Sequence, residues 1–354
     1  MNRREFFRHS LALAAIGAVA ADRPAPVEPT YARLPRWRGF NLLNKCYGHR
    51  HRPFDERDFV LLREWDFDFV RLPLSYRCWS NPDDLRRMSE PVLKEIDDAV
   101  EFGRRHRIHV SLNFHRAPGY CVNPPAEPFD LWTDEKVLDG CAFQWAAFAR
   151  RYRGVPNTQI SFNLLNEPAR VTEETYVRVA QRLIEAIREQ DERRLILADG
   201  LEWGRVPVPG LIELKVAQST RGYDPMRVTH YKANWVPGAD GWPKPTWPIR
   251  DERDRLWDKE RLRKERIEPW RALAAKGVGV HVGEWGAHQF TPHPVALAWM
   301  RDLTELWREA GWGWALWNLH GNFGVLDSGR TDVAYEEFRG HKLDRAMLEI
   351  LQRA

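Results

Sequence analysis

Cysteine is scarce in this sequence. Among 354 residues there are four cysteines, at positions 46, 78, 121 and 141, and no two of them form a C-x-x-C pair. This spacing argues against a zinc framework or a disulfide scaffold, and a chain of this length can bury a core large enough to need neither. One bridge, between Cys46 and Cys78 or between Cys121 and Cys141, stays compatible with an oxidising compartment.

Long apolar runs are missing as well. The apolar run Leu11–Ala20 is shorter than the roughly 20 residues that a membrane helix needs. It follows the paired arginines Arg3-Arg4 and ends in Ala18-Val19-Ala20, so that residues 1–21 resemble a twin-arginine export signal. We expect cleavage after Ala20 or Ala21, no membrane span in the mature chain and a periplasmic or secreted location, with an uncleaved anchor as the alternative.

The sequence also has no block of one charge. Its 54 basic and 50 acidic residues leave a formal charge of +4, spread along the chain and without an aromatic-basic RNA motif. Nucleic acid is therefore not an expected partner. With 43% hydrophobic and 29% charged residues, the composition is that of a globular protein. After a proline-rich connector over 22–35, no repeat or low-complexity linker divides the chain, so residues 36–354 are predicted to form one domain.

Strand-like and helix-like stretches alternate through this domain. Strands are predicted at Gly39–Leu43, Phe67–Leu74, Ile108–His115, Thr158–Glu167, Arg194–Asp199, Arg227–Tyr231, Val278–Glu284 and Gly313–Trp317. Amphipathic helices are predicted at Val92–Arg105, Gln144–Arg151, Glu173–Gln190, Asp254–Lys276 and Pro294–Ala310. Eight strands with helices between them predict an α/β fold, a single (β/α)₈ TIM barrel. In such barrels functional groups stand at the C-terminal ends of the strands.

Two of the predicted strands end in a glutamate. The run Ser161–Leu165 is followed by Asn166-Glu167-Pro168, and the small and β-branched run from Val278 ends in Glu284. A carboxyl group at the lip of a buried strand can have a raised pKa and still meet a substrate, as a general acid requires. A glutamate followed by proline can also simply open the next helix. The second copy of the pattern favours a functional pair.

The other predicted strand ends carry polar or aromatic side chains. They are Asn41 and Asn44 near strand one, Arg71 in strand two, His115 at the end of strand three, Asn166 on strand four, His230 and Tyr231 on strand six, and Trp317 on strand eight. Each alone is compatible with a structural role, such as a buried ion pair for Arg71 or core packing for Trp317. Together, at positions that one architecture brings to one edge, they predict an active site.

This set resembles the active-site residues of glycoside hydrolase family 5, the cellulase and mannanase family of the retaining (β/α)₈ clan. The C-terminal segments 322–330 and 341–344 are also similar to that family, and the resemblance covers roughly residues 36–351. It implies that Glu167 is the acid/base and Glu284 the nucleophile. Family members commonly carry His-x-Tyr on strand six, whereas this chain has His230-Tyr231-Lys232, so that Tyr231 or Lys232 is expected to contact the nucleophile.

Retaining hydrolysis needs one protonated and one ionised carboxyl group, about 5–5.5 Å apart. Glu167, beside the neutral Asn166, is the better candidate for a raised pKa, and His230 could donate to it or relay protons. Arg71 is the available cation to keep Glu284 ionised. Asn166 can bind the sugar 2-hydroxyl, a contact that strengthens in the transition state.

Tryptophan is abundant, with 17 residues, several of them in predicted loops. Flat apolar rings suit the CH faces of pyranose sugars, so Trp132 and Trp235 are predicted to line sugar subsites, with loop packing as the alternative. The Trp- and Pro-rich insertion 233–250 is expected to wall one end of the cleft. Tyr120, in the loop after strand three, is a further candidate sugar contact.

These features predict an enzyme, a retaining glycoside hydrolase that cleaves a β-linked oligo- or polysaccharide, β-1,4-glucan above others. The alternatives are a β-mannanase or other hemicellulase of the same mechanism, or a catalytically inactive carbohydrate-binding barrel, which the retained glutamates argue against. A metal hydrolase is the third, but His49, His51, His106 and His109 lack a ligand arrangement. No cofactor and no metal are therefore expected, and the sequence leaves the oligomeric state open.

Overall fold

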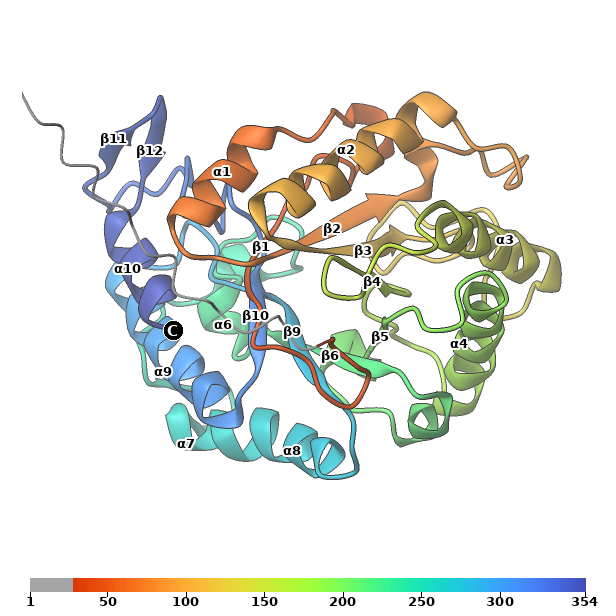
Figure 1. Ribbon diagram of the computed structural model, residues 1–354. Coiled ribbons are helices and arrows are strands. Elements are labelled where there is room, and N and C mark those ends of the chain that lie inside the picture. Colours follow the sequence, from red (N-terminus) through yellow and green to blue (C-terminus); the bar gives the residue numbers. More distant parts are fainter. Residues whose placement is uncertain (1–27) are drawn as a thin grey trace, which may run out of the picture.

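A closed barrel of eight parallel strands forms the centre of the computed structural model, which describes residues 28–354 (Figure 1). The predicted export signal over 1–21 and the first residues of the predicted connector lie outside this range. Around the barrel the strands follow the order β1-β10-β9-β6-β5-β4-β3-β2. Their bounds are Arg38–Asn41 (β1), Phe69–Ser75 (β2), His109–Arg116 (β3), Ile160–Asn163 (β4), Ile196–Asp199 (β5), Ala217–Gly222 (β6), Val280–Trp285 (β9) and Gly313–Leu316 (β10). The prediction of a single (β/α)₈ barrel is confirmed.

Helices surround the barrel and connect its strands (Figure 1). The longer ones are α1 (Glu56–Glu64), α2 (Glu90–His106), α3 (Glu135–Arg151), α4 (Glu173–Arg188), α8 (Glu268–Ala274), α9 (His293–Ala310) and α10 (Arg345–Arg353). Short turns are α5 (Leu201–Gly204), α6 (Met226–Thr229) and α7 (Lys259–Leu262), the last continued by a π-helical turn over Arg263–Ile267. Two small hairpins, β7 (Ile249–Arg250) with β8 (Leu256–Trp257) and β11 (Glu336–Phe338) with β12 (His341–Leu343), lie outside the barrel.

The helix α4 illustrates why these segments are helical. Thr172 caps its first turn by accepting from the backbone N–H of Thr175, and Glu173 and Glu174 follow in the first turn, where the helix dipole favours acidic groups. Its apolar side chains recur every three or four residues and are buried against the barrel. The stripe therefore fixes which face of the helix covers the strands.

The apolar core has two parts. The larger part fills the space between the outside of the barrel and the helices. The smaller part closes the N-terminal end of the barrel interior, and we call it the floor; it consists of Trp37, Phe69, Leu195, Leu197, Ala217 and Ala315. His109 stacks on the ring of Trp37 with centroids 3.7 Å apart. The floor closes one end of the barrel interior, and we call the opposite end, at the C-terminal ends of the strands, the mouth.

The prediction of the sixth strand at Arg227–Tyr231 is wrong. Residues 226–229 form the helical turn α6, and the strand that completes the barrel is β6, ten residues earlier. Its sequence, Ala-Gln-Ser-Thr-Arg-Gly, is polar although all six residues are buried. Hydropathy therefore gives no strand signal there, whereas the seven other barrel strands overlap their predicted ranges.

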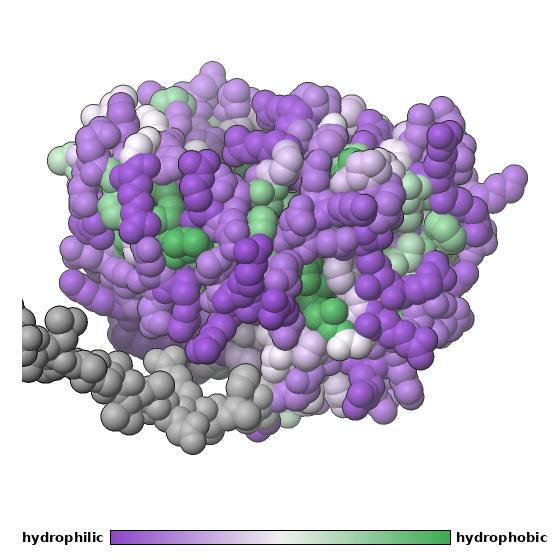
Figure 2. Space-filling view, turned by 45° about the horizontal axis from the view of Figure 1, so that its top comes forward, coloured by the Kyte–Doolittle hydropathy of each residue, from purple (hydrophilic) through white to green (hydrophobic). Residues whose placement is uncertain are grey.

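The outer surface is largely hydrophilic on the face shown in Figure 2, where hydrophobic residues form small separate patches. Among residues 28–354 no helix is long and apolar enough to cross a bilayer. All four cysteines are free, so neither bridge that the sequence permitted is formed.

Candidate active site

Glu167 lies in the loop that leaves β4 at the mouth. Buried Leu164 and Leu165 anchor this loop, and Glu167 has a left-handed backbone conformation with a φ of 51°. Its backbone N–H donates to Asp199 Oδ2 at 2.9 Å. A non-glycine residue in this conformation costs about 1–3 kcal/mol, and such strain concentrates at functional sites. The bond to Asp199 fixes the Glu167 backbone in this conformation.

Glu284 enters the mouth from β9. The pairing of β6 with β9 is irregular here, since Thr220 pairs with Val282 but Arg221 pairs with Glu284, which leaves Gly283 as a bulge. A bulge of this kind turns the following side chain to a new direction. The Oε1 atom of Glu284 accepts from Arg71 Nη1 at 2.6 Å and from Arg221 Nη2 at 3.3 Å, and the hydroxyl of Tyr223 donates to Oε2 at 3.3 Å.

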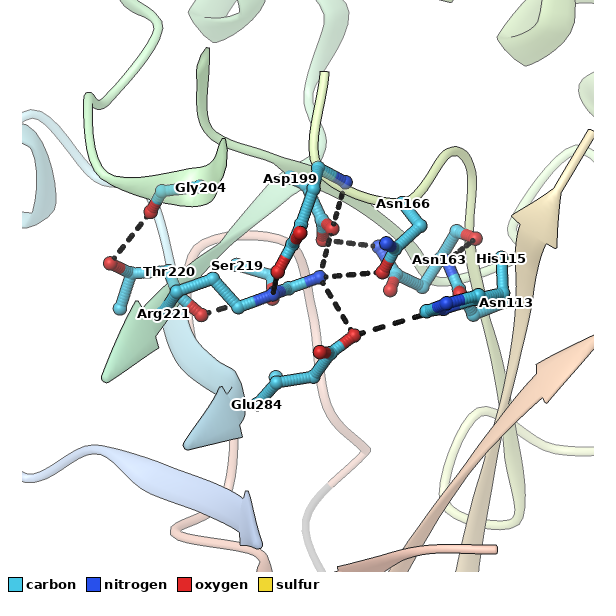
Figure 3. A network of polar contacts seen from close by, with 12 residues as sticks. Asn113, His115, Asn163, Asn166, Asp199, Gly204, Ser219, Thr220, Arg221 and Glu284 are labelled. Atoms are coloured by element: carbon cyan, nitrogen blue, oxygen red, sulfur yellow. Dashed lines mark hydrogen bonds and ion pairs between the residues drawn. The ribbon is translucent and has the colours of Figure 1, made fainter. Parts of the chain in front are cut away.

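The two glutamates meet on a single guanidinium group. Arg221 donates through Nε to Glu167 Oε1 at 2.9 Å, while its Nη2 reaches Glu284. Figure 3 shows Arg221 between Asp199 and Glu284. Since the five donors of a guanidinium lie on one small planar fork, both carboxyl groups face the same space, less than about a nanometre apart. The two strand-end glutamates are therefore brought together, as the sequence predicts.

Arg71 is fully enclosed below this space. It donates through Nε to Asn163 Oδ1 at 2.9 Å and through Nη1 to Asn41 Oδ1 at 3.0 Å, in addition to its bond with Glu284. These amides satisfy the charged group that burial would otherwise penalise, and they fix the guanidinium against the carboxylate. Asn41 was expected near strand one, but nothing in the sequence pointed to Asn163.

The two glutamates at the mouth have different electrostatic surroundings. Burial raises the pKa of Glu167 to about 7, and the nearby charge of Glu284 acts in the same direction, while Arg221 opposes both. Glu167 can therefore carry a proton near neutral pH. Burial, together with the charges of Arg71 and Arg221, lowers the pKa of His115 well below its usual value, so its ring is neutral. His115 Nδ1 lies 3.9 Å from Glu284 Oε1.

Asn166 presents an amide donor to the same space. Its Oδ1 accepts from Arg71 Nη2 at 2.8 Å and from Arg221 Nη2 at 3.0 Å. This fixes the orientation of the amide, and its Nδ2 atom is buried without a hydrogen-bond partner among residues 28–354. An unpartnered buried donor is costly unless a ligand completes it, so Nδ2 is suited to a substrate hydroxyl.

The residues expected on strand six lie elsewhere. His230 follows α6, where its Nδ1 bonds to the Thr229 hydroxyl at 2.9 Å, and burial lowers its pKa to about 4. Lys232 is exposed and lies over the ring of Tyr231. Within the described part of the chain, none of the three bonds to either glutamate. The tyrosine that reaches Glu284 is Tyr223, so the expectation that Tyr231 or Lys232 does so is wrong.

Two further residues of the mouth were not predicted, Arg221 and Asp199. Asp199 ends β5 and is fully buried, where it accepts from Asn163 Nδ2 and from the Glu167 backbone and pairs with Arg221. The end of the strand Arg194–Asp199 was correctly predicted, so its terminal aspartate was a usable signal. Arg221 lies in β6, the polar strand for which hydropathy gives no signal.

The predicted aromatic residues differ in their exposure. Trp317 is partly exposed and stacks over His115 with centroids 5.4 Å apart. Trp235 is 50% exposed and packs edge-on against His288. Tyr120, in contrast, is buried, and its hydroxyl donates to the backbone carbonyl of Glu167 at 2.8 Å. Trp132 packs edge-on against Tyr120, so this pair supports the Glu167 loop.

One group of possible metal ligands occurs in the described range 28–354, and it lies outside the mouth. The ligand atoms of His320, Asp327 and His341 lie within 4.8 Å of one another. His341 Nδ1 already bonds to Asp327 Oδ2 at 2.7 Å, and His320 Nε2 bonds to Asp58 Oδ1 at 2.8 Å. These contacts join the β11–β12 hairpin to the loop after β10 and to α1.

A (β/α)₈ barrel with two carboxyl groups on one buried arginine at its mouth has the architecture of a glycoside hydrolase. The family model of cellulase (glycosyl hydrolase family 5) matches residues 27–323. The chain belongs to this family, and it is a glycoside hydrolase.

Similar proteins agree with this result. A crystal structure of a glycoside hydrolase shares 39% identity and a TM-score of 0.86, covering 90% of this chain and 99% of that one. Endoglucanase C of Acetivibrio thermocellus is 24% identical over 305 residues, 79% of this chain and 88% of that protein. Thermotoga maritima Cel5A, solved in complex with mannotriose, has 21% identity and a TM-score of 0.72, with 89% of this chain and 97% of that chain covered.

Proposed function

We propose that this enzyme is a retaining β-glucanase that acts on β-1,4-linked glucan, with Glu167 as the acid/base and Glu284 as the nucleophile. The observation that carries the assignment of roles is the pair of carboxyl groups on Arg221, one with a pKa raised to about 7 and the other held by Arg71. The endoglucanase among its relatives supports a glucan as the substrate.

In the first step Glu284 attacks the anomeric carbon and Glu167 gives its proton to the leaving glycosidic oxygen. In the second step Glu167, now a carboxylate, takes a proton from water as the water attacks the anomeric carbon and releases Glu284. The unpartnered Nδ2 of Asn166 is suited to the 2-hydroxyl of the sugar that reacts. Tyr223 and Arg71 orient the Glu284 carboxylate for attack.

The test of this function is a product analysis. Purified enzyme is incubated with soluble β-1,4-glucan, β-1,3-glucan, mannan and xylan, and the anomer released first from the preferred substrate is followed by NMR. We expect the fastest cleavage on β-1,4-glucan and a β-configured first product. Faster cleavage of mannan or xylan would contradict the substrate, and an α-configured first product would contradict the retaining mechanism.

The role of Glu167 has a separate test. In a Glu167→Ala variant, azide should restore hydrolysis of an activated aryl β-glycoside and yield a β-glycosyl azide, because a good leaving group needs no acid and azide replaces the base-assisted water. The Glu284→Ala variant is the matched control and should not give this product. Absence of rescue in Glu167→Ala would overturn the acid/base assignment.

We further propose that residues 1–21 direct the enzyme to the periplasm or the exterior. The paired arginines and the short apolar run support this role. Fractionation of cells that express the full chain should find activity outside the cytoplasm, and replacing both Arg3 and Arg4 with lysine should retain it inside. Equal export of the two forms would contradict a twin-arginine route.

A further inference from the structure

An arginine stands on strand six where the family pattern leads one to expect a histidine. The tyrosine that contacts Glu284 is Tyr223, and the residue two positions before it is Arg221, so the strand carries Arg-x-Tyr in place of His-x-Tyr. The side chain of Arg221 is 1% exposed. A permanently charged group thus occupies a position beside both reacting carboxyl groups, where histidine would carry a charge only when protonated.

The surroundings of Arg221 are fitted to its guanidinium. Nη1 donates to the Ser219 hydroxyl and to the Thr220 carbonyl, each at 3.1 Å. A Cβ atom on Gly283 would lie 2.7 Å from Nη1, and one on Gly204 would lie 2.6 Å from the Arg221 Cγ. Glycine at these two positions therefore leaves room for the Arg221 side chain.

Asp199 balances this second buried cation. Its Oδ2 atom pairs with Arg221 Nη2 and lies 3.8 Å from Arg71 Nη2. An unpaired charge at this depth would be strongly destabilising, so Asp199 is what allows an arginine to be tolerated here. Asp199 also holds the Glu167 backbone, which couples the pair to the acid/base.

The ionic charges facing Glu167 then cancel. Arg71 and Arg221 supply two positive charges, and Asp199 and Glu284 supply two negative charges while Glu167 is protonated. His115 is neutral, and burial raises the pKa of the Tyr120 and Tyr223 hydroxyls, which stay protonated.

The reaction preserves this balance. As Glu284 forms its bond to the anomeric carbon it loses its charge, and as Glu167 releases its proton to the leaving oxygen it gains one. One negative charge therefore passes from Glu284 to Glu167, and it returns when water protonates Glu167 and releases Glu284. Arg221 contacts both ends of this exchange, at 3.3 Å and 2.9 Å.

We propose that Arg221 is a positioning residue that pairs with whichever of Glu284 and Glu167 is ionised in each half-reaction, and that Asp199 is its fixed counter-charge. This inference rests on the function proposed above. The negative charge of Asp199 offsets part of the attraction between Arg221 and the Glu167 carboxylate. Glu167 therefore holds its proton until the leaving group takes it.

The experiment compares wild type, Asp199→Asn, Arg221→His and the double variant on an aryl β-glycoside with a poor leaving group. Without its counter-charge, Arg221 should stabilise the Glu167 carboxylate, so Asp199→Asn should move the alkaline limb of kcat/KM to lower pH by about one unit. Arg221→His removes the nearer of the two cations that face Asp199 and leaves Arg71 as the other, at 3.8 Å. The double variant removes both charges, so its kcat/KM should exceed that of each single variant by about tenfold.

Asp344→Asn is the matched control, because Asp344 is a fully buried aspartate that caps α10, far along the chain from the mouth. Its alkaline limb should coincide with that of wild type. An unmoved limb in Asp199→Asn, or a double variant whose kcat/KM does not exceed that of each single variant, would overturn the inference. Activity of the wild type on β-glucan, lost in Glu284→Gln, shows in the same assays whether the proposed function itself holds.

Circular dichroism identifies variants that fail to fold. In that case Arg221→Lys decides the question, since lysine keeps the charge but cannot contact both glutamates at once. We expect its alkaline limb to stay near that of wild type. On a second aryl glycoside with a good leaving group, both the burst of aryl leaving group and the steady-state rate should fall about tenfold. An Arg221→Lys variant equal to wild type in both phases would overturn the inference.

Discussion

The floor and the mouth of the barrel both bury titratable side chains, but different groups contact these side chains at the two ends. At the floor, His109 stacks on Trp37, has Phe69 beside it, and bonds to the Thr158 carbonyl and the Ser161 hydroxyl. Burial lowers the pKa of His109 and of His281 to about 3, so both rings are neutral at any ordinary pH. At the mouth, Arg71, Arg221, Asp199 and Glu284 are equally buried.

The difference lies in the partners. The floor offers aromatic faces and neutral dipoles, which do not compensate a charge removed from water, so its histidines give up their protons. At the mouth each cation touches carboxylates and each carboxylate touches a guanidinium, so ionised groups persist within the same barrel. Packing thus stabilises one end, and a network of paired charges prepares the other end for chemistry.

The largest expected effect comes from Glu284→Gln, which removes the carboxylate of the proposed nucleophile but keeps its size. Because glutamine cannot form the glycosyl ester, kcat on an aryl β-glycoside should fall by roughly 10⁴-fold or more. The melting temperature should change little, since the amide oxygen can still accept from Arg71. Mass spectrometry with a slow fluorinated glycoside should trap an adduct on wild type and none on the variant. Retained hydrolysis would refute the nucleophile assignment.

The next effect is a pH dependence that belongs to the mouth alone. Glu167 must be protonated to act as the proposed acid. Burial raises its pKa to about 7, so kcat/KM should fall about tenfold per pH unit above that value. Because the folded-state pKa lies above the usual 4.5, the unfolded chain binds fewer protons between pH 4.5 and 7, and this group's contribution to stability declines as pH rises through 7.

The control for this pH dependence is Glu167→Gln on an aryl glycoside with a good leaving group. Its first step needs no acid, so its burst rate should show no alkaline limb near pH 7. A limb that persisted there would place the titrating group elsewhere.

A change at the floor should affect stability without affecting the pH profile. His109→Phe keeps a ring stacked on Trp37 but leaves the Ser161 hydroxyl and the Thr158 carbonyl without this partner. We expect a loss of about 2 kcal/mol in the free energy of unfolding, measured by urea denaturation. The alkaline limb of kcat/KM should coincide with that of wild type. A shifted limb would show that floor and mouth are electrostatically coupled.

The smallest expected effect concerns Trp235, at the exposed rim beyond the mouth. If its half-exposed ring carries a sugar, Trp235→Ala should raise KM for a long cello-oligosaccharide about five-fold and leave an aryl monoglycoside unaffected. Leu256→Ala removes another exposed apolar side chain, on β8, and serves as the matched control. Equal effects of the two substitutions would speak against a subsite at Trp235.

The barrel has strands with an apolar pattern and one strand without it, and this difference decides which of them the sequence predicts. Strands such as β3, β4 and β9 carry apolar residues on the side that faces the helices, so their hydropathy predicts both the strand and the polar residue at its end. His115, Glu167 and Glu284 were found in this way. The strand β6 has no such signal, because its Gln218, Ser219 and Thr220 are buried by hydrogen bonds and not by apolar contact.

The sequence by itself determined the barrel and the two glutamates, since a buried run that ends in a carboxyl group needs only local pattern to be recognised. Only the tertiary structure decided what surrounds them. Arg221 meets Glu167 and Glu284 from 54 and 63 residues away, and Tyr223 takes the place expected for Tyr231 or Lys232. The charge on a buried group depends on such distant partners, and no pattern of neighbouring residues records them.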